Sequence, residues 1–212
     1  MLIVHQIINS PIPSNCFVLY DKAVGDDCII IDPGSRRDDE IFGYLDEKDL
    51  IPKYIILTHE HFDHCWGVNE LVERYSIPIV CSSVCADFIR YEKKNCSVFY
   101  DNIERFVINT PTISIESLNN ILSFAKTELR FFVSPGHSDA SICFTIQKHL
   151  FTGDTLIKDV STVTKLPTGS VKKLKESFEL LSRFQGNGYI VCPGHGDVFR
   201  LDEYELSKIF RY

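Results

Sequence analysis

Four short segments of the chain carry histidine or aspartate directly after an apolar, strand-like run. They are Thr58–His64, Pro135–Ser138, Phe151–Thr155 and Pro193–Gly196, after the runs Ile55–Leu57, Phe131–Val133, Leu150–Phe151 and Ile190–Cys192. The end of a strand is where a rigid scaffold presents loops that carry function. The pattern therefore predicts a fold built on strands, with potential metal ligands in the loops that follow them.

The first of these segments is the densest in potential ligands. Three imidazoles and one carboxylate, from His59, His61, Asp63 and His64, lie within six residues. Histidine and aspartate suit zinc, and often iron or manganese. A loop that turns after a strand can send His59 and His61 to one ion and Asp63 and His64 to another. Glu60 does not make this a zincin HExxH motif, because the second histidine of that motif would fall at Asp63.

The composition is that of an ordinary soluble globular protein, with 44% hydrophobic and 24% charged residues among 212. The formal net charge of -7 argues against a protein held to nucleic acid mainly through phosphate contacts. No apolar run approaches the roughly 18 residues of a membrane span. We therefore expect neither a membrane nor a nucleic acid as partner.

The eight cysteines do not predict a disulfide framework. The start of the sequence lacks the basic region and cleavage site of a secretory signal, so the expected location is the cytoplasm. Free cysteine is usually buried. We expect reduced thiols that pack as small apolar groups.

Apolar runs and turn residues predict one domain over residues 1–212. Strands are expected at 2–8, 16–20, 28–31, 54–57, 78–80, 129–133, 142–146, from 150, and at 189–192. Helices are expected at 38–50, 66–75, 83–94, 170–184 and 202–210, with Ser170 as an N-cap. Residues 95–120 read as irregular connections with short strands. This order predicts two packed sheets with helices outside.

The ordered set His59-x-His61-x-Asp63-His64, His137, Asp154 and His195 resembles the metallo-β-lactamase superfamily, and most of all its small glyoxalase II-like hydrolases. The resemblance runs from Asp32-Pro33-Gly34 to Pro193-Gly194-His195-Gly196, nearly the whole chain. It implies an α/β (α+β) fold, an αββα sandwich of two mixed β-sheets flanked by helices. The site would lie at one edge, between the sheets.

The resemblance also implies a role for each potential ligand. His59, His61 and His137 would hold one metal, and Asp63, His64 and His195 a second, with Asp154 bridging the two. Asp32 and Thr58 would orient the ligands, as the residues behind a metal site commonly do. The cofactors implied are two divalent ions, with zinc expected and iron or manganese as alternatives. For Asp32, a plain turn residue before Pro33 is the competing interpretation.

This site predicts a binuclear metallohydrolase. A hydroxide that bridges two such ions attacks a carbonyl carbon, while a metal polarises the carbonyl oxygen. Asp63 and Asp154 would be the catalytic carboxylates, with Asp63 orienting the nucleophile or accepting its proton. The expected substrate is a small anionic molecule, a thioester or ester. Lys158 and Lys165 either meet that substrate or are solvated, and Phe62 and Trp66 either line its pocket or pack in the core.

Three alternatives stay open. A persulfide dioxygenase shares much of the motif but uses one iron and molecular oxygen. An RNA-processing metallonuclease usually adds a large inserted domain or a basic arm, which this acidic chain lacks. The third is a metal-binding scaffold without activity. Antibiotic hydrolysis is disfavoured, because enzymes of the commonest subclass have a cysteine where this chain has Asp154, and lack the histidine at position 64. Glutathione specificity is not expected, because neither the glutathione-gripping stretch nor the C-terminal helical domain of glyoxalase II is evident.

Overall fold

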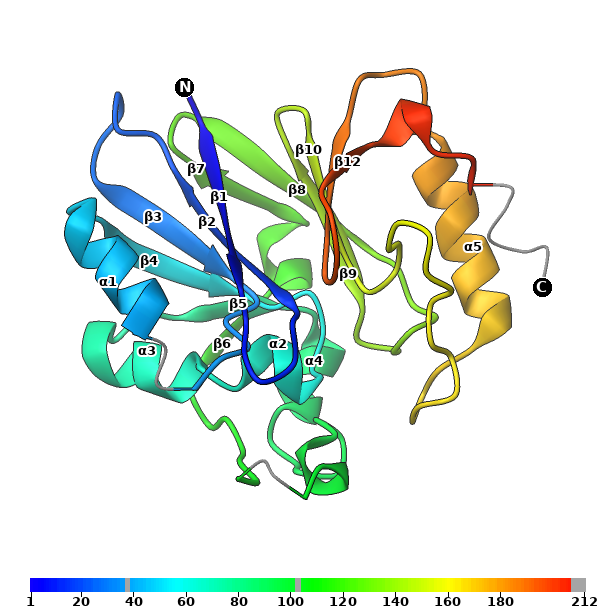
Figure 1. Ribbon diagram of the computed structural model, residues 1–212, viewed down its shortest axis with the longest axis horizontal. Helices are drawn as coiled ribbons and strands as arrows, with labels where there is room; N and C mark the ends of the chain where they lie inside the picture. The colour runs from blue at the N-terminus through cyan, green and yellow to red at the C-terminus, as the bar shows by residue number, and fades with distance from the viewer. Residues whose placement is uncertain (37–38, 102–103, 207–212) are drawn as a thin grey trace.

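The computed structural model describes residues 1–36, 39–101 and 104–206. Two six-stranded sheets face each other, and helices lie on their outer faces (Figure 1). This is the expected sandwich of two mixed sheets with flanking helices.

The first sheet is formed by the amino-terminal half of the chain. Its order is β1(Ile3–Ile8), β2(Asn15–Tyr20), β3(Asp27–Ile31), β4(Ile51–Ile56), β5(Ile79–Cys81) and β6(Thr112–Ser114). The first three strands pair antiparallel, and β3 to β6 pair parallel. The helices of this half are α1(Asp39–Glu47), α2(Phe62–Cys65), α3(Val68–Tyr75) and α4(Ser83–Phe88), with the 3-10 turns Ser97–Phe99 and Ile115–Leu118.

The second sheet follows in the carboxyl-terminal half. Its order is β12(Phe199–Arg200), β11(Ile190–Pro193), β10(His149–Gly153), β9(Ile142–Ile146), β8(Thr127–Val133) and β7(Ile121–Phe124). Only the β10–β11 pair is parallel among these strands. Helix α5(Val171–Ser182) packs on the outer face, and a 3-10 turn covers Leu201–Glu203.

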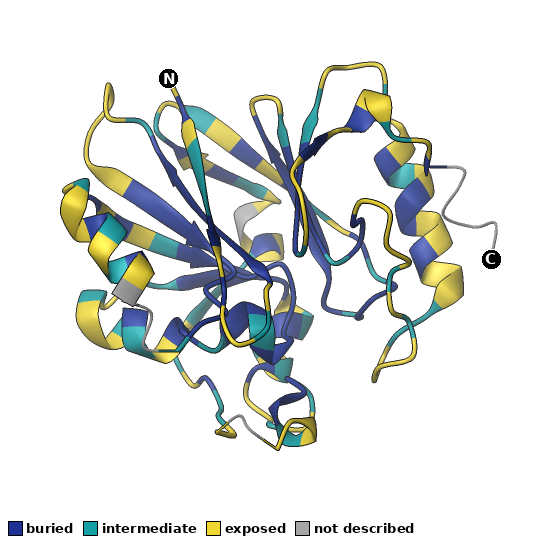
Figure 2. Cartoon of the chain, in the orientation of Figure 1, coloured by how far each residue is buried: buried dark blue, intermediate teal, exposed yellow. Residues whose placement is uncertain are grey.

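The core between the sheets is built by strict alternation along the strands. In β2, Phe17 and Leu19 join the core shared by the two sheets, whereas Cys16 and Val18 join the core under the helices. Period-two alternation places successive side chains on opposite faces of a sheet. Phe17 meets Phe151 of β10 edge-on, with ring centroids 5.3 Å apart. Both faces of the central strands are therefore buried, as Figure 2 shows.

The helix expected over 66–75 is present as α3(Val68–Tyr75), and a separate short helix, α2, precedes it at Phe62–Cys65. Two other predicted helices need correction. The one expected over 83–94 ends at Phe88, and the chain continues in turns to Cys96, whose φ is 66°. Where a helix was expected over 202–210, the structure shows the turn Leu201–Glu203, and residues 207–210 lie outside the described part.

Two further local predictions are confirmed. The Ser170 hydroxyl accepts a hydrogen bond from the Lys173 amide and caps α5. All eight cysteines are free and buried. Within the described ranges, no helix has the length and apolar character needed to cross a membrane.

Candidate metal centre

The histidine and aspartate segments meet at one edge of the sandwich, where four strands end. The segment with His59 follows β4, and His137 comes four residues after β8. Asp154 directly follows β10, and His195 comes two residues after β11. Residues from both sheets thus form a single cluster.

Three histidines form the first group of potential ligands. His61 Nδ1 and His137 Nε2 lie 2.9 Å apart, and the rings of His59 and His61 have centroids 4.7 Å apart. One nitrogen from each of His59, His61 and His137 lies within 4.8 Å of the others. This is the set expected for one metal.

Asp63, His64 and His195 form a second group, whose ligand atoms also lie within 4.8 Å of one another. His195 Nε2 lies 3.2 Å from Asp63 Oδ2, and His64 Nε2 lies 3.6 Å from the same oxygen. Asp154 reaches both groups. Its Oδ1 lies 3.4 Å from His64 Nε2, and its Oδ2 lies 3.6 Å from His137 Nε2.

Several atoms aimed into this cluster lack a partner. Among the described residues, His59 Nε2, His61 Nε2, His64 Nε2 and Asp154 Oδ1 are buried without a hydrogen bond. Buried polar atoms are nearly always paired, so such a concentration needs an explanation. Imidazole nitrogens and carboxylate oxygens are the donors that zinc, iron and manganese accept. The residues present fit divalent cations.

In four of the five histidines, the ring nitrogen Nδ1 faces away from the cluster and contacts another group. His59 Nδ1 lies 3.1 Å from Thr58 Oγ1, and His64 Nδ1 lies 3.1 Å from Asp32 Oδ2. His137 Nδ1 contacts the Val163 carbonyl oxygen at 2.8 Å, and His195 Nδ1 contacts that of Pro13 at 3.1 Å. Such contacts fix the ring orientation of a metal-binding histidine. In all four rings they leave Nε2 toward the centre.

Asp32 and Thr58 lie behind the histidines. Asp32 is buried in a left-handed conformation with a φ of 50°. Its carboxylate accepts hydrogen bonds from the Thr58 amide at 2.8 Å and the Thr58 hydroxyl at 2.7 Å. Asp32 therefore does more than precede Pro33 in a turn.

A family model described as the metallo-beta-lactamase superfamily matches residues 9–195, most of the chain. The chain belongs to the metallo-β-lactamase superfamily. Two relatives of the chain support this membership. The chain is 28% identical to the probable metallo-hydrolase YqgX of Bacillus subtilis, over 88% of this chain and 86% of that protein. It is 27% identical to a hydroxyacylglutathione hydrolase of Pectobacterium atrosepticum, over 86% of this chain but 59% of that protein.

Two solved structures share the fold. BLEG-1, a B3 metallo-beta-lactamase, superposes with a TM-score of 0.87 and 26% identity, over 98% of this chain and all of that one. TTHA1623 in a di-iron-bound form superposes with a TM-score of 0.78 and 23% identity, over 93% of this chain and 95% of that one.

The pKa values of the buried histidines differ between the two ligand groups. Burial and the neighbouring imidazoles lower the pKa of His59 well below its usual value and that of His61 to about 3. Burial alone would also lower the pKa of His64, but the carboxylates of Asp63 and Asp154 raise it to about 10. At neutral pH the metal-free protein therefore has neutral rings at His59 and His61 and a protonated ring at His64.

The sequence did not reveal two buried polar side chains that support the site. They are Ser14, at the end of the β1–β2 connection, and Asn15, at the start of β2. Asn15 Nδ2 donates to the carbonyl oxygens of Pro193 and Gly196 at 2.9 and 2.8 Å, on either side of His195. The Ser14 hydroxyl donates to the Asp63 carbonyl oxygen. The only signal in the sequence was the position of these polar residues at the start of a buried strand.

Glu60 was also missed as a structural element of the site. Its buried carboxylate accepts hydrogen bonds from the Ser138 hydroxyl, at 2.7 Å to each oxygen. This contact ties the loop after β4 to the loop that carries His137. Burial raises the pKa of Glu60 to about 7.

Gly194 sets how closely the His195 loop approaches Asp154. A Cβ there would lie 2.1 Å from Asp154 Oδ1 and 2.8 Å from His64 Cε1. Any side chain at this position would displace two potential ligands, so only glycine fits at position 194.

Proposed function

We propose that this superfamily member is a binuclear metal-dependent hydrolase, with zinc as its metal, that cleaves a small thioester or ester. The observation that carries the proposal is the convergence of five histidines and two aspartates, with buried unpaired atoms at the centre. The likeness to a hydroxyacylglutathione hydrolase favours an acylated thiol as substrate.

The residue roles follow from the two ligand groups. His59, His61 and His137 would hold one ion, Asp63, His64 and His195 the other, and Asp154 both. Bound divalent ions supply Lewis-acid activation of water and of a carbonyl group. Asp63 lies beside His195 and orients the attacking water or takes its proton. Water oxygen adds to the acyl carbon, the carbon–sulfur bond breaks, and the leaving thiolate takes a proton.

The substrate reaches the centre from the side of the second group. The side chain of His195 is 25% exposed, that of Asp63 14% and that of Asp154 11%, whereas those of His64 and His137 are at most 4% exposed. Lys158 and Lys165 are exposed on the loop that follows Asp154. Their charge supports an anionic substrate.

The same reasoning extends to partners and location. The net charge of -7 supports a small molecule rather than RNA as substrate. Eight free thiols support a reducing compartment, and we assign the protein to the cytoplasm.

A substrate panel tests the proposal. Zinc-loaded protein is assayed with acylated glutathione and other acyl thiols, a chromogenic cephalosporin, single-stranded RNA at low salt, and glutathione persulfide with an oxygen electrode. We expect thiol release that a chelator abolishes and zinc restores. Asp154→Ala should lower the rate at least ~100-fold, since even residues behind the ligands contribute about 10–100-fold. The matched control is Asp26→Ala, at an exposed aspartate in the connection between β2 and β3.

Other results would overturn the assignment. Oxygen consumption with the persulfide and one bound iron would favour a dioxygenase. Cephalosporin cleavage without thiol release would favour the activity named for BLEG-1. RNA cleavage alone would favour a nuclease.

A further inference from the structure

Large apolar side chains are exposed on two segments beside the centre. The first segment, residues 95–100, exposes Phe99 by 60% and Tyr100 by 46%. The second, residues 157–166, exposes Val160 by 53%, Val163 by 50% and Leu166 by 39%. We call them the aromatic rim and the aliphatic rim. Exposed apolar groups that gather near a site mark a binding surface.

The aromatic rim is attached to the ligand loop. Phe62 stands between His61 and Asp63 in the chain, and its amide donates to the Asn95 carbonyl oxygen at 2.8 Å. The rings of Phe62 and Tyr100 have centroids 4.4 Å apart. Phe62 itself is buried with Cys96, Trp66 and Ile12, so it belongs to the core that supports this rim.

The aliphatic rim is attached to the other side of the centre. The Val163 carbonyl oxygen contacts His137 Nδ1 at 2.8 Å. The Thr162 hydroxyl donates to the Thr155 carbonyl oxygen at 3.1 Å, one residue after Asp154. These two contacts, each between a side chain and a backbone carbonyl oxygen, hold the rim next to the ligands and leave the valine side chains exposed.

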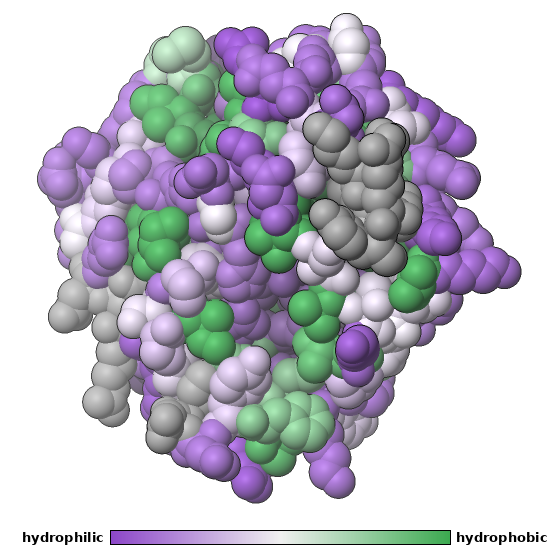
Figure 3. Space-filling model, turned by 45° about the vertical axis from the view of Figure 1, so that its right-hand side comes forward, coloured by the Kyte–Doolittle hydropathy of each residue, from purple (hydrophilic) through white to green (hydrophobic). Residues whose placement is uncertain are grey.

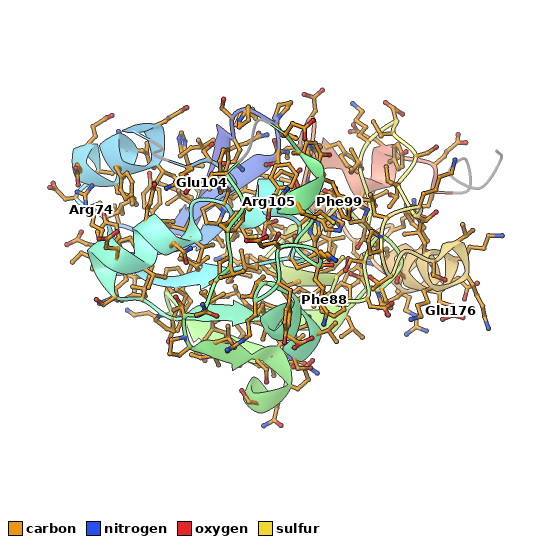
Figure 4. The ribbon with its side chains drawn as sticks, turned by 90° about the horizontal axis from the view of Figure 1, so that it is seen from below. Arg74, Phe88, Phe99, Glu104, Arg105 and Glu176 are labelled. Atoms are coloured by element: carbon orange, nitrogen blue, oxygen red, sulfur yellow. The ribbon has the colours of Figure 1, made fainter. Side chains whose placement is uncertain are left out.

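The figures agree with an apolar border around a polar centre. Figure 3 shows a hydrophilic hollow with separate apolar patches around it. Figure 4 looks at the molecule from below and shows Phe99 near the middle of the view, whereas Arg74 and Glu176 lie at its two sides.

We infer that the two rims bind the acyl chain of the substrate, and that this chain is apolar and several carbons long. The inference rests on the proposed hydrolase function for the position of the carbonyl group. With that carbonyl at the ligand cluster, the apolar chain would extend toward the two segments that carry Val163 and Phe99, which are attached to His137 and to Phe62 of the ligand loop. Each methylene removed from water favours binding.

Binding of carboxylates, the products of such a reaction, tests the inference without turnover. Equilibrium dialysis with labelled acetate and octanoate gives the two Kd values on zinc-loaded protein. We expect octanoate to bind at least ~10-fold more tightly than acetate, because the rims cover part of the chain. Phe99→Ala and Val163→Ala, singly and together, should reduce this preference, and Val163→Ala keeps the carbonyl oxygen that contacts His137.

The matched control is Ile51→Ala. Ile51 is 52% exposed at the start of β4, the end opposite to the ligand loop. This variant should keep the wild-type preference, and unchanged circular dichroism should show that all variants fold. Equal affinity for the two carboxylates in the wild type would overturn the inference, as would rim variants that behave like Ile51→Ala.

Kinetics separate this inference from the proposed function. Acetyl and octanoyl thioesters of one thiol are compared, and the ratio of their kcat/KM values should follow the ratio of the affinities. If neither thioester is cleaved while octanoate still binds preferentially, the hydrolase proposal fails and the apolar site stands. If both are cleaved equally and both carboxylates bind equally, the apolar site fails and the hydrolase stands.

Discussion

His64 differs from the other buried histidines of the centre in the charge around it. Asp63, Asp154 and Asp32 all lie within 3.6 Å of its ring nitrogens. Their charge outweighs the burial that would lower its pKa and raises it to about 10. His59 and His61 have few such neighbours and a lowered pKa. The two halves of the centre therefore hold different numbers of protons when no metal is bound.

This difference predicts proton release during metal loading. A metal binds only the neutral imidazole, so the ion held by His64 must expel a proton at any pH below about 10. Its affinity should rise as the pH rises from 6 to 8. The ion held by His59 and His61 expels none from those rings at pH 7. Addition of zinc to weakly buffered metal-free protein, followed with an indicator dye, measures the protons released per equivalent. Two equivalents that release none would contradict the assignment of His64.

At the scale of single residues, the sequence identifies potential metal ligands better than it identifies the residues that hold the ligand loops in place. Histidines and aspartates at strand ends are recognisable because their chemistry is unusual there. The hydrogen-bond partners of Glu60 and Asn15 cannot be recognised in this way. Ser138 is 78 residues from Glu60 in the sequence, and Pro193 is 178 residues from Asn15. Only the folded chain brings such polar groups together.

The end of the β1–β2 connection and the first residue of β2 support the His195 loop. Asn15 is buried, its amide side chain donates on both sides of His195, and its backbone amide donates to the Gly194 carbonyl oxygen at 2.7 Å. The His195 ring contacts the Pro13 carbonyl oxygen of the same connection. The position of this ligand therefore depends on a segment about 180 residues away in the sequence.

Asn15→Ala tests that dependence. Loss of both side-chain donors should weaken the ion held by His195 by about 10–100-fold, the usual effect of residues that orient ligands. The ion held by His59, His61 and His137 should change less. Chelator competition measured for each equivalent separates the two ions. Asn109→Ala, at an exposed asparagine, is the control. Equal weakening of both ions would mean that Asn15 serves the fold and not the His195 loop.

Strands were predicted more reliably than helices in this chain. Runs such as Cys28–Ile31 are buried on both faces and are apolar throughout, so the pattern identifies them. Helix ends depend on packing that the pattern does not contain. The short helix α2 at Phe62–Cys65 was not predicted, and α4 ends at Phe88, before Cys96 turns into the left-handed region.

At the scale of the molecule, both sheets contribute to each ligand group. The loop after β4 of the first sheet supplies His59, His61, Asp63 and His64, and the second sheet supplies His137, Asp154 and His195. The apolar core between the sheets fixes their separation. The family resemblance in the ligand order predicted this architecture, whereas composition alone predicted only a soluble globular chain.

The number of metal ions bound per chain tests the central claim most directly. Metal-free protein is titrated with zinc, and bound metal is measured after removal of the excess. The account predicts two equivalents for the wild type and at most one tightly bound equivalent for Asp154→Ala, because Asp154 lies between the two groups. A wild-type protein that binds only one equivalent at saturation, or an Asp154→Ala variant that retains two tightly bound ions, would contradict the binuclear centre.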